Sequence, residues 1–548
     1  MDPHPFGWLS LVPPLVAIAL AILTRQTLIS LLIGIISGAI ILQDGNVFAG
    51  LWSTVADYLW PKLIAEDKLQ VYTFTLLTGG MIGLVSASGG MRGLVNLIVP
   101  FANTRSKGQV TSWLMGLVIF IDDYANMLLL GGTLRQITDR LKISREKLAY
   151  IVDSTAAPVS GLAIVSTWVA TEINYIEEGI NQISGENKPD AFLLFLQSIP
   201  YRFYTLWALL LVPLVAVLKR DMGPMVKAEV TALTEPEIAD ETNPAADKLP
   251  QTSSWLNAAI PIGVMLTVVI GFLYYTGFTT ATEEGIADPS LLQIFGNGDS
   301  YISLLYGSAI GLMVAIVQIA PQRLLSAKQL GWAVLKGFWA MAPALFILWL
   351  AASLAAQTEP PTIDEATGQM TLNGLNTAGY LEQILRANLS ITFLPTIIFL
   401  IASAVAFSTG TSWGTMGILV PLSVSLTANM LTAGGQPLDV SDPILLTVVG
   451  SVLAGAIFGD HCSPISDTTI LSSQSCGCNH VAHVRTQMPY ALLGAVASIV
   501  AGTIPVALGL PVFFCHILGV GVLVGTLFLL GRNPETIAAE MKQSPDPS

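Results

Sequence analysis

Charged residues are scarce in this sequence. Asp, Glu, Lys and Arg make up 11% of its 548 residues, whereas hydrophobic residues make up 53% and the mean hydropathy is +0.66. Soluble globular proteins carry about 25% charged residues. Apolar runs of ~20 residues, which are long enough to cross a bilayer as helices, recur to the end of the chain. The composition therefore predicts an integral protein of the lipid bilayer, with no separate soluble domain and no nucleic-acid partner.

Cysteine is also scarce, with four residues in the chain and no disulfide framework. Cys476 and Cys478 precede His480 and His483, and these are the residue types of a zinc site. Zinc ligands of this kind are usually separated by two to four residues, and here only one separates the cysteines. The spacing favours a polar loop, and we expect no cofactor.

What the sequence does contain is a group of acids inside one of its most apolar regions. Asp460, His461 and Asp467 lie within eight positions of one another. Charged groups at membrane depth are costly, so such residues usually mark a functional site that faces the protein interior. Gly459 and Pro464 interrupt helical hydrogen bonding here. The stretch 460–468 is therefore predicted to be a break in a membrane helix.

A near-copy of this stretch occurs in the first half of the chain. Residues 157–167 align without gaps on residues 463–473, and Asp153 stands upstream as Asp460 does in the second copy. Two Pro-interrupted apolar segments at corresponding positions of two halves point to the binding site of a transporter. We expect a second helix break over residues 153–160.

The distribution of Lys and Arg predicts the topology. Cytoplasmic loops carry an excess of these residues. Segment 110–132 has basic loops on both sides, and segment 391–430 has acidic surroundings on both sides, so neither fits a simple crossing. Both are predicted to be re-entrant hairpins, with tips at 122–126 and 408–414, because non-helical backbone at membrane depth is tolerated where it lines a cavity.

The predicted fold is an all-α polytopic membrane protein with about 11 transmembrane helices plus the two hairpins. Two inverted-topology repeats place their broken helices at the midplane. The predicted domains are an N-terminal repeat (1–218), a flexible cytoplasmic linker (219–254), a C-terminal repeat (255–511), and an extra helix with a polar tail (512–548). The Met-Asp-Pro-His start has no basic region, which argues against a cleaved signal peptide. We expect a multi-pass protein of the plasma (inner) membrane.

The two hairpin tips and two breaks are expected to meet around one cavity. Their side chains offer mainly oxygen atoms, which suit hard cations rather than zinc or copper. An alternative is that the hydroxyl groups only cap the breaks, and that His461 is a structural histidine rather than a proton carrier. The candidate residues are Asp122, Asp123, Asn126, Asp153, Ser154, Thr155, Ser160, Ser408, Thr409, Thr411, Ser412, Asp460, His461, Ser463, Ser466, Asp467 and Thr468.

The acids suggest how exchange would work. Burial disfavours the charged form of a carboxyl group, whereas a bound Na⁺ stabilises it. Na⁺ and H⁺ would then compete for the same group, and alternating access would couple their movements. We expect the transported Na⁺ at Asp153, Asp460 and Asp467. The sequence leaves the oligomeric state open, a homo-oligomer included.

At these residues the sequence resembles the NhaC-type Na⁺/H⁺ antiporter family of the ion transporter superfamily. Residues 459–473 look like the family signature, and residues 483–490 look like its continuation. The resemblance extends through 120–126 and 153–160. It implies a secondary transporter with hairpins and interrupted helices in inverted repeats. Members of the family are also thought to exchange organic acids such as malate and lactate.

Two alternative functions are an organic-acid exchanger and an intramembrane hydrolase. An organic-acid exchanger coupled to Na⁺ or H⁺ would need helix N-termini or basic groups for its cargo, and the excess of acids weighs against it. An intramembrane hydrolase would use Ser463 or Ser466 with His461 and Asp460. Neighbours on one broken helix rarely reach the nucleophile–base geometry that this chemistry requires. The sequence therefore favours a transporter over an enzyme.

Overall fold

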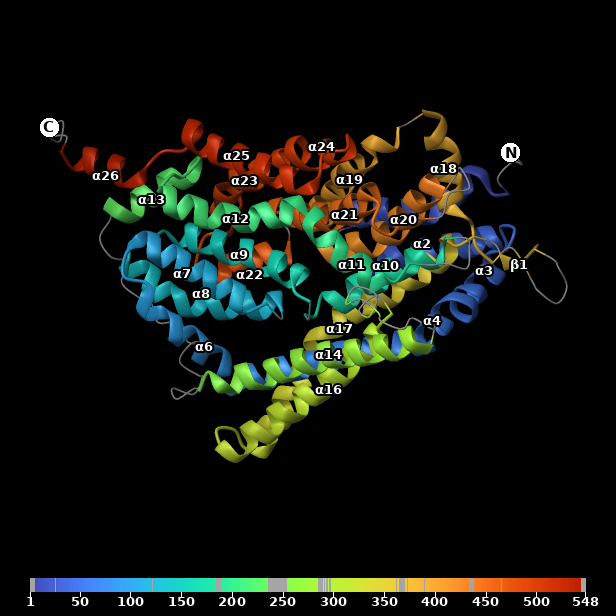
Figure 1. The fold of residues 1–548 in the computed structure, drawn as a ribbon, viewed down its shortest axis with the longest axis horizontal. Helices are drawn as coiled ribbons and strands as arrows, with labels where there is room; N and C mark the ends of the chain where they lie inside the picture. The colour runs from blue at the N-terminus through green and yellow to red at the C-terminus, as the bar shows by residue number, and fades with distance from the viewer. Residues whose placement is uncertain are drawn as a thin grey trace.

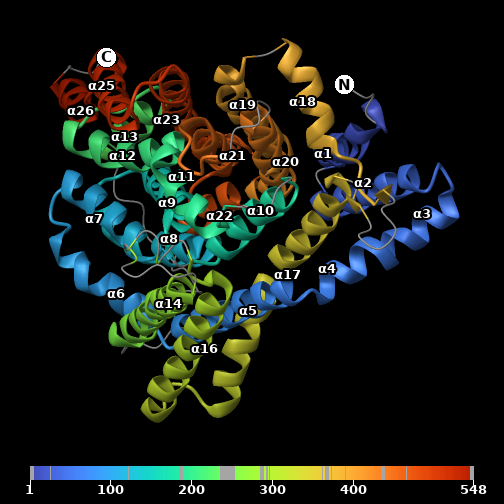
Figure 2. The same cartoon turned by 45° about the vertical axis from the view of Figure 1, so that its right-hand side comes forward.

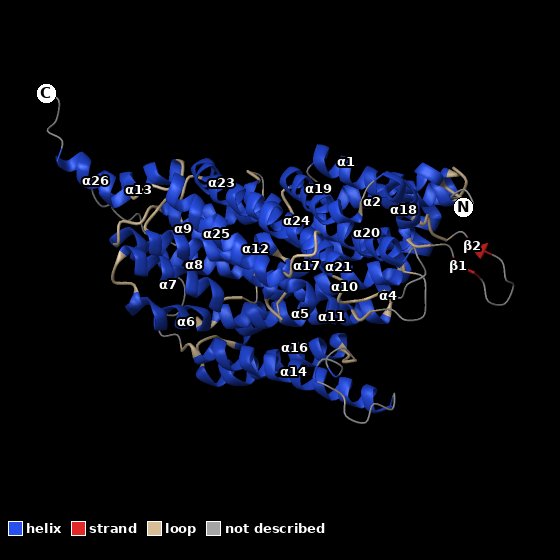
Figure 3. Ribbon diagram, turned by 45° about the horizontal axis from the view of Figure 1, so that its top comes forward, coloured by secondary structure: helices blue, strands red, loops and turns tan. Residues whose placement is uncertain are grey.

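The computed structural model describes residues 5–543, with gaps. The gaps are residues 25, 121, 165, 184–188, 235–253, 284–288, 290, 292–293, 295–296, 361, 364–369, 372, 389, 433–437 and 465. Within the described residues, helices form nearly the whole molecule, and the short strands β1 (Thr362–Ile363) and β2 (Met370–Thr371) pair at its edge (Figure 3).

The first half of the chain contains thirteen α-helices and four shorter helical segments among its described residues. They are η1 (Gly7–Leu11), α1 (Val12–Thr24), α2 (Thr27–Leu42), α3 (Val47–Ser53), η2 (Thr54–Leu59), α4 (Trp60–Ile64), α5 (Glu66–Ala87), α6 (Gly90–Ile98), η3 (Val99–Phe101), α7 (Arg105–Val118), α8 (Asp123–Arg140), α9 (Arg145–Leu162), α10 (Val169–Asn181), α11 (Ala191–Ser198), η4 (Ile199–Tyr201), α12 (Phe203–Leu218) and α13 (Pro224–Thr234).

The second half begins with the longest helices of the molecule. Its helices are α14 (Leu256–Glu283), α16 (Ser300–Ile319), η6 (Ala320–Gln322), α17 (Ala327–Thr358), α18 (Thr377–Asn388), η7 (Ile391–Phe393), α19 (Leu394–Thr409), α20 (Ser412–Thr432), α21 (Pro443–Cys462), α22 (Asp467–Ser475), α23 (His480–Ala497), η8 (Ser498–Thr503), α24 (Ile504–Ala507), α25 (Val512–Leu530) and α26 (Pro534–Gln543).

Many of these helices are suited to a membrane. Among the described residues, nine are long and apolar enough to cross a bilayer, or ten if the bent pair formed by 191–201 and 203–218 is one span. Two shorter apolar helices lie near the N-terminus, at 7–21 and 28–42. The predicted class, an all-helical polytopic membrane protein, is confirmed. The count of about 11 crossing helices stays a prediction.

The helices form two connected parts (Figures 1 and 2). Helices α14 and α16 lie together at one side, and α5 and α17 run between this pair and the rest of the bundle. Glycines allow α5 and α17 to approach closely: a Cβ on Gly337 would meet the Gly79 carbonyl, and one on Gly83 would meet the Ala333 carbonyl. Small residues of this kind are the usual means of helix packing in membranes.

Helices α7 and α8 form a helical hairpin. A side chain on Gly108 would contact Leu141 at the far end of α8, and Arg105 donates to the carbonyl of Lys142. The start of α7 therefore lies beside the end of α8, and the chain reverses direction between these two helices. This is the arrangement predicted for segment 110–132, with longer arms. That the hairpin is re-entrant in a membrane stays a prediction.

The second predicted hairpin has a turn but longer arms. Helix α19 ends at Gly410, whose φ of 70° suits glycine, and α20 begins two residues later. Residues 391–409 and 412–432 are each long and apolar enough to cross a bilayer alone. Their length therefore allows full crossings as well as a re-entrant hairpin, and the hairpin stays a prediction.

One of the two helix breaks lies where it was predicted, and the other does not. The second break matches the prediction, because α21 ends at Cys462 and α22 begins at Asp467. The first break, predicted at 153–160, is wrong in place: α9 continues through Pro158 to Leu162, and α10 starts only at Val169. Proline removes a single backbone donor, and membrane helices tolerate this where neighbours compensate.

The two halves of the chain contact each other through corresponding helices. Helix α22, which follows the second break, packs against α8 of the first hairpin. Helix α10, which follows the first break, packs against α20 of the second hairpin. This exchange is the contact pattern expected of two related repeats, although their inverted orientation stays a prediction.

The predicted linker is partly structured. Helix α13 occupies its first part, buries Met225 and Val230, and packs against α26 near the C-terminus. The first part of the predicted linker therefore contains a packed helix, whereas the division into two repeats joined by a linker stays a prediction. The three buried positions of this helix, Met225, Glu229 and Val230, are too few among eleven to give a clear pattern in the sequence. The rest of the predicted linker, 235–253, lies outside the described residues.

Candidate ion-binding site

Asp460 lies at the centre of the second break and is completely buried. It belongs to the last turn of α21, and its carboxylate accepts hydrogen bonds from two hydroxyl groups at the start of α22. Ser466 Oγ donates to Oδ1 and Thr468 Oγ1 donates to Oδ2, both at 2.6 Å. The carboxylate at the end of α21 is therefore bound by two hydroxyl groups on the other side of the break, at the start of α22.

Asp467 is the second acid of the break, and its side chain is exposed. The Tyr124 hydroxyl of α8 donates to its Oδ2, and the backbone N–H of Thr468 donates to Oδ1 at 3.0 Å. The Tyr124 contact joins the turn of the first hairpin to the second break. Asp467 and Asp153 are electrostatic neighbours of Asp460.

Asp153 lies on α9 in a separate hydrogen-bonded group. Gln487 Nε2 of α23 donates to its Oδ2 at 2.5 Å, and His483 Nε2 lies 3.5 Å from the same oxygen. Gln487 also donates to the carbonyl of His461 at 3.0 Å. The His461 ring contacts the hydroxyl of Tyr204 through Nδ1 at 2.9 Å. Asp153 and His461 thus share partners on α23, whereas Asp460 is held within its own break.

The first hairpin turn brings Asp122, Asp123 and Asn126 into the interior, all buried. The Thr167 hydroxyl, from the first break, donates to Asp122 Oδ2 at 3.2 Å. Asn126 donates through Nδ2 to the carbonyls of Gly116 and Ile119, both at 2.9 Å, and so closes the turn between α7 and α8. Asp123 has Asp122 and Asp467 as electrostatic neighbours.

Several predicted hydroxyl ligands instead satisfy the backbone. Thr155 donates to the carbonyl of Ile151 one turn earlier, Thr409 to its own turn, and Ser463 to the carbonyl of Phe407 at 2.7 Å. This matches the capping alternative for those three residues. The remaining candidates Ser154, Ser160 and Ser412 are buried, and Ser408 and Thr411 are partly buried at the second turn.

The carboxylates do not form one ligand cage. No group of three His, Cys, Asp or Glu side chains in the described part of the chain is arranged to hold a metal ion. Asp153, Asp460 and Asp467 each have different hydrogen-bond partners, so they do not enclose one shared ion in this conformation. Nor do Cys476, Cys478 and the nearby histidines form such a group.

Most acids of the site have no Lys or Arg partner. Within the described ranges, no Lys or Arg forms an ion pair with Asp123, Asp153, Asp460 or Asp467, although His483 lies beside Asp153. Buried charges in proteins are normally paired or bind cations. The arrangement can therefore hold hard cations or protons at its oxygen atoms.

Some residues of the site were not identified from the sequence. Tyr124 and Gln487 contact the acids directly. Both lie in the stretches 120–126 and 483–490 that carry the family resemblance, but their residue types alone did not mark them as candidate ligands. The buried pair of Arg202 and Glu172 lies at the first break, with Arg202 Nη1 2.7 Å from Glu172 Oε2 and 2.5 Å from the Gly161 carbonyl. The residues of this pair are distant in sequence, so no local motif marks it.

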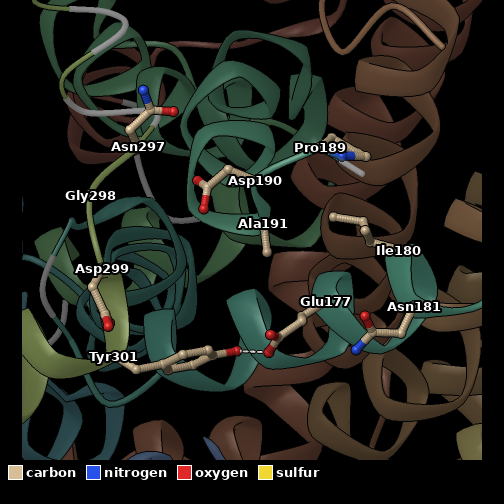
Figure 4. A pocket seen from close by; sticks show the side chains of 10 residues that line it. All are labelled: Glu177, Ile180, Asn181, Pro189, Asp190, Ala191, Asn297, Gly298, Asp299 and Tyr301. Carbon is tan, nitrogen blue, oxygen red and sulfur yellow. Dashed lines mark hydrogen bonds between the residues drawn. The ribbon is translucent and has the colours of Figure 1, made fainter. Parts of the chain in front are cut away.

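An acidic cavity of about 440 Å³ lies at the far end of α10, away from the predicted site residues (Figure 4). Glu177, Asp190 and Asp299 line it, and Tyr301 donates a hydrogen bond to Glu177. Burial raises the pKa of Asp190 to about 6, and the charges of Glu177 and Asp299 add to this effect. Its open, acidic lining would attract cations to this surface.

The geometry also bears on the hydrolase alternative. Ser463 donates to the carbonyl of Phe407, and Ser466 donates to Asp460 rather than to His461. Ser472 and Asp153 both approach His483, but at the same ring atom, Nε2. A catalytic triad uses the two ring nitrogens for its two partners. The arrangement therefore lacks a nucleophile–base–acid chain.

Comparison with known proteins decides the family. The model of the Na⁺/H⁺ antiporter family matches residues 161–504. The chain belongs to this family. The match includes the second break and begins just before the first, and it leaves the hairpin of α7 and α8 outside.

Individual relatives agree with this assignment. An uncharacterized protein of Haemophilus influenzae is 35% identical over 499 residues, which cover 89% of each chain. The malate-2H⁺/Na⁺-lactate antiporter of Bacillus subtilis is 40% identical over 100 residues, 18% of each chain. An uncharacterized Na⁺/H⁺ antiporter of Haemophilus influenzae is 36% identical over 115 residues, 20% of this chain and 21% of the relative.

Two solved structures share the fold. The YdaH transporter of Alcanivorax borkumensis, described as having an unusual topology, superposes with a TM-score of 0.52 at 13% identity, covering 86% of this chain and 91% of that one. MtrF of Neisseria gonorrhoeae, from a class of antimetabolite efflux pumps, gives 0.51 at 12% identity, covering 88% and 85%. The family member described here is a multi-pass secondary transporter, and its family and structural relatives are transporters rather than enzymes.

Proposed function

We propose that this protein is a Na⁺/H⁺ antiporter of the plasma membrane, in which Na⁺ and protons compete for the carboxylates of the second break. The observation that carries the proposal is the environment of Asp460. Its carboxylate is buried between two hydroxyl groups, and no cation of the described chain pairs with it. A carboxylate in such surroundings is stabilised either by a proton or by a bound cation.

The hydroxyl partners suit both states. Ser466 and Thr468 now donate to Asp460. A hydroxyl group also has two lone pairs, so the same oxygens can turn toward a Na⁺ bound by the carboxylate. Asp467 adds a second carboxylate at the exposed side of the break, and this acid would meet an entering cation first.

The organic-acid alternative rests on the relative named as a malate-2H⁺/Na⁺-lactate antiporter, to which 18% of this chain is similar. An anionic cargo would need an available positive group. Arg202 is the basic residue at the first break, but Glu172 and two other partners already occupy its guanidinium. The electrostatics of the breaks therefore favour a cationic cargo.

The test uses purified protein in liposomes with a pH-sensitive dye inside. An imposed Na⁺ gradient should drive proton movement in the wild type. Asp460→Asn keeps the size and hydrogen bonding of the side chain but removes its charge, and it should abolish this movement. Asp57→Asn, an exposed acid away from the breaks, is the control and should behave as wild type.

The same liposomes distinguish the two cargoes. Proton movement driven by malate or lactate gradients, with no response to Na⁺ alone, would contradict the proposal and support the organic-acid exchanger. Full Na⁺-driven activity in Asp460→Asn would show that this carboxylate is not the shared site.

A further inference from the structure

One arginine holds the open end of the first hairpin, which lies opposite its turn. Arg105 at the start of α7 donates to the carbonyl of Lys142, just beyond the end of α8, and so joins the two arms. Its guanidinium also pairs with Glu229 of α13 at 2.5 Å and lies 3.6 Å from Glu535 of α26. Arg105 therefore links both arms of the hairpin to two helices from other parts of the chain.

Glu229 binds the same end of the hairpin from the interior. It is fully buried, and both of its carboxylate oxygens accept hydrogen bonds. Oε2 accepts from Arg105, and Oε1 accepts the backbone N–H of Ser144, the N-cap of α9, at 2.7 Å. Paired and hydrogen-bonded in this way, a buried charge can be tolerated. Arg105 and Glu229 together form a clasp that joins the hairpin and α9 to α13.

The two helices behind the clasp are themselves held together. Asp221 precedes α13 and Arg532 precedes α26, and their backbones exchange two hydrogen bonds at 2.9 and 2.8 Å. Arg220 donates to the carbonyls of Phe528 and Gly531 at 3.0 and 2.9 Å. Helix α13 also packs on α26. The clasp therefore attaches the hairpin to a base of two helices with a fixed relative position.

The other end of the hairpin reaches the second break. Helix α8 has 18 residues and is roughly 27 Å long. Near its start Tyr124 donates to Asp467, and further along a Cβ on Gly131 would meet the Ser475 side chain of α22. Asn126 closes the turn against α7. A hairpin that is closed at both ends and packed along α22 moves as one body, so its open end helps to set where its turn lies.

We propose that Arg105 and Glu229 are positioning residues for the second break: by fixing the open end of the hairpin, they hold Tyr124 against Asp467. Opening the clasp lets the turn move, so the Asp467 carboxylate loses the tyrosine that orients it and Na⁺ binds more weakly. The proposal rests on the proposed function, because Asp467 is there the acid that meets the entering cation first.

The experiment combines changes at the two ends of the hairpin. The double variant Arg105→Met, Glu229→Gln opens the clasp and removes both charges of the buried pair together, and the amide oxygen of Gln keeps the hydrogen bond to α9. Tyr124→Phe removes the contact at the turn, and a triple variant carries all three changes. Lys219→Gln is the matched control, because Lys219 pairs with the same Glu535 at 3.1 Å from the exposed side of the base.

The Na⁺ dependence of proton movement in liposomes gives the KM for Na⁺ of each protein. The double variant and Tyr124→Phe should each raise this KM at least about fivefold, as expected for coupled sites. The triple variant should show a KM well below the product of the two changes, since both act on the same contact. Lys219→Gln should keep the wild-type KM.

Two results would overturn the proposal. A KM of the triple variant that equals the product would mean that the clasp and Tyr124 act independently. A double variant with less protein or a lower melting temperature but an unchanged KM would mean that the clasp only stabilises the fold.

Hydrogen–deuterium exchange of the same proteins follows the hairpin without transport. Opening the clasp should speed exchange of the backbone amides around Tyr124 as well as those around Ser144. Faster exchange confined to the open end would overturn the proposal and leave the proposed function intact. A wild type without Na⁺-driven proton movement would overturn the proposed function, and the exchange rates around Tyr124 would then decide alone whether the clasp positions the turn.

Discussion

The two helix breaks are similar in sequence but opposite in electrostatics. At the first break, the buried Glu172 pairs with Arg202 at 2.7 Å, and Arg202 also donates to the carbonyl of Gly161. At the second break, Asp460 is equally buried and accepts hydrogen bonds from two hydroxyl groups. The buried acid of the first break therefore has a basic counterion, whereas Asp460 has no Lys or Arg partner in the part of the chain that the structure describes.

This difference suggests that the two breaks have different roles. A neutral, internally satisfied break holds its helix ends in place and gains nothing from a bound ion. An unpaired buried carboxylate is costly until a proton or a cation joins it. The first break would then serve as a fixed support, and the second as the site where cargo binds. The predictions below test that contrast at matched positions.

The largest effect is expected at the first break. Arg202→Met leaves Glu172 buried without a partner, and loss of one member of a buried pair costs about 3–5 kcal/mol. Thermal unfolding in detergent should show a strongly destabilised protein. The double variant Arg202→Met, Glu172→Gln should recover much of that stability, because the isolated charge is gone.

The second break provides the opposite control. Asp460→Asn should leave the thermal stability unchanged or higher, since it removes an unpaired buried charge. If Arg202→Met proves as stable as the wild type, or Asp460→Asn as unstable as Arg202→Met, the two breaks do not differ in the way proposed.

A smaller effect is expected at Asp467. This acid is exposed, and Asn in its place still accepts the hydrogen bond from Tyr124. We expect Asp467→Asn to retain exchange but to raise the KM for Na⁺ about tenfold, the equivalent of roughly 1.4 kcal/mol. The measurement is the Na⁺ dependence of proton movement in liposomes.

Asp299→Asn in the acidic cavity is the matched control, because Asn also caps the start of α16. It should leave the KM unchanged. A complete loss of exchange in Asp467→Asn would mean that Asp467 is as necessary for exchange as Asp460. That result would contradict the smaller role proposed for Asp467.

The sequence predicted the second break well because several signals coincide there. Gly459, Pro464 and two acids interrupt one apolar run, and the helix ends between them. The first break was misplaced because Pro158 alone does not end α9. The carbonyls at the end of that helix are bound partly by a distant residue: Arg202, 41 residues away, donates to Gly161, while the nearby Ser166 donates to Ser160. Pairings of this kind depend on packing between distant helices and leave no local pattern.

The smallest and most closely matched effect concerns the two serines that bind backbone N–H groups at the entry of the second helix of each break. Ser166 accepts the N–H groups of Trp168 and Val169 at 3.1 and 3.2 Å and donates to the Ser160 carbonyl, so all of its contacts are to the backbone. Ser466 caps α22 through Thr469 but donates to Asp460.

Ser466→Ala removes the N-cap of α22 and should cost about 1 kcal/mol of stability. Ser166→Ala removes two hydrogen bonds to the N–H groups at the entry of α10, and its cost should be similar, about 1 kcal/mol. Only Ser466→Ala also removes a hydrogen bond to the charged carboxylate, so only this variant should change the KM for Na⁺, by several-fold. Ser166→Ala should be destabilised to a similar degree and bind Na⁺ as the wild type does. An equal change of KM in both variants would mean that the cap of the first break also acts on the cargo, and the contrast between a supporting and a binding break would no longer hold.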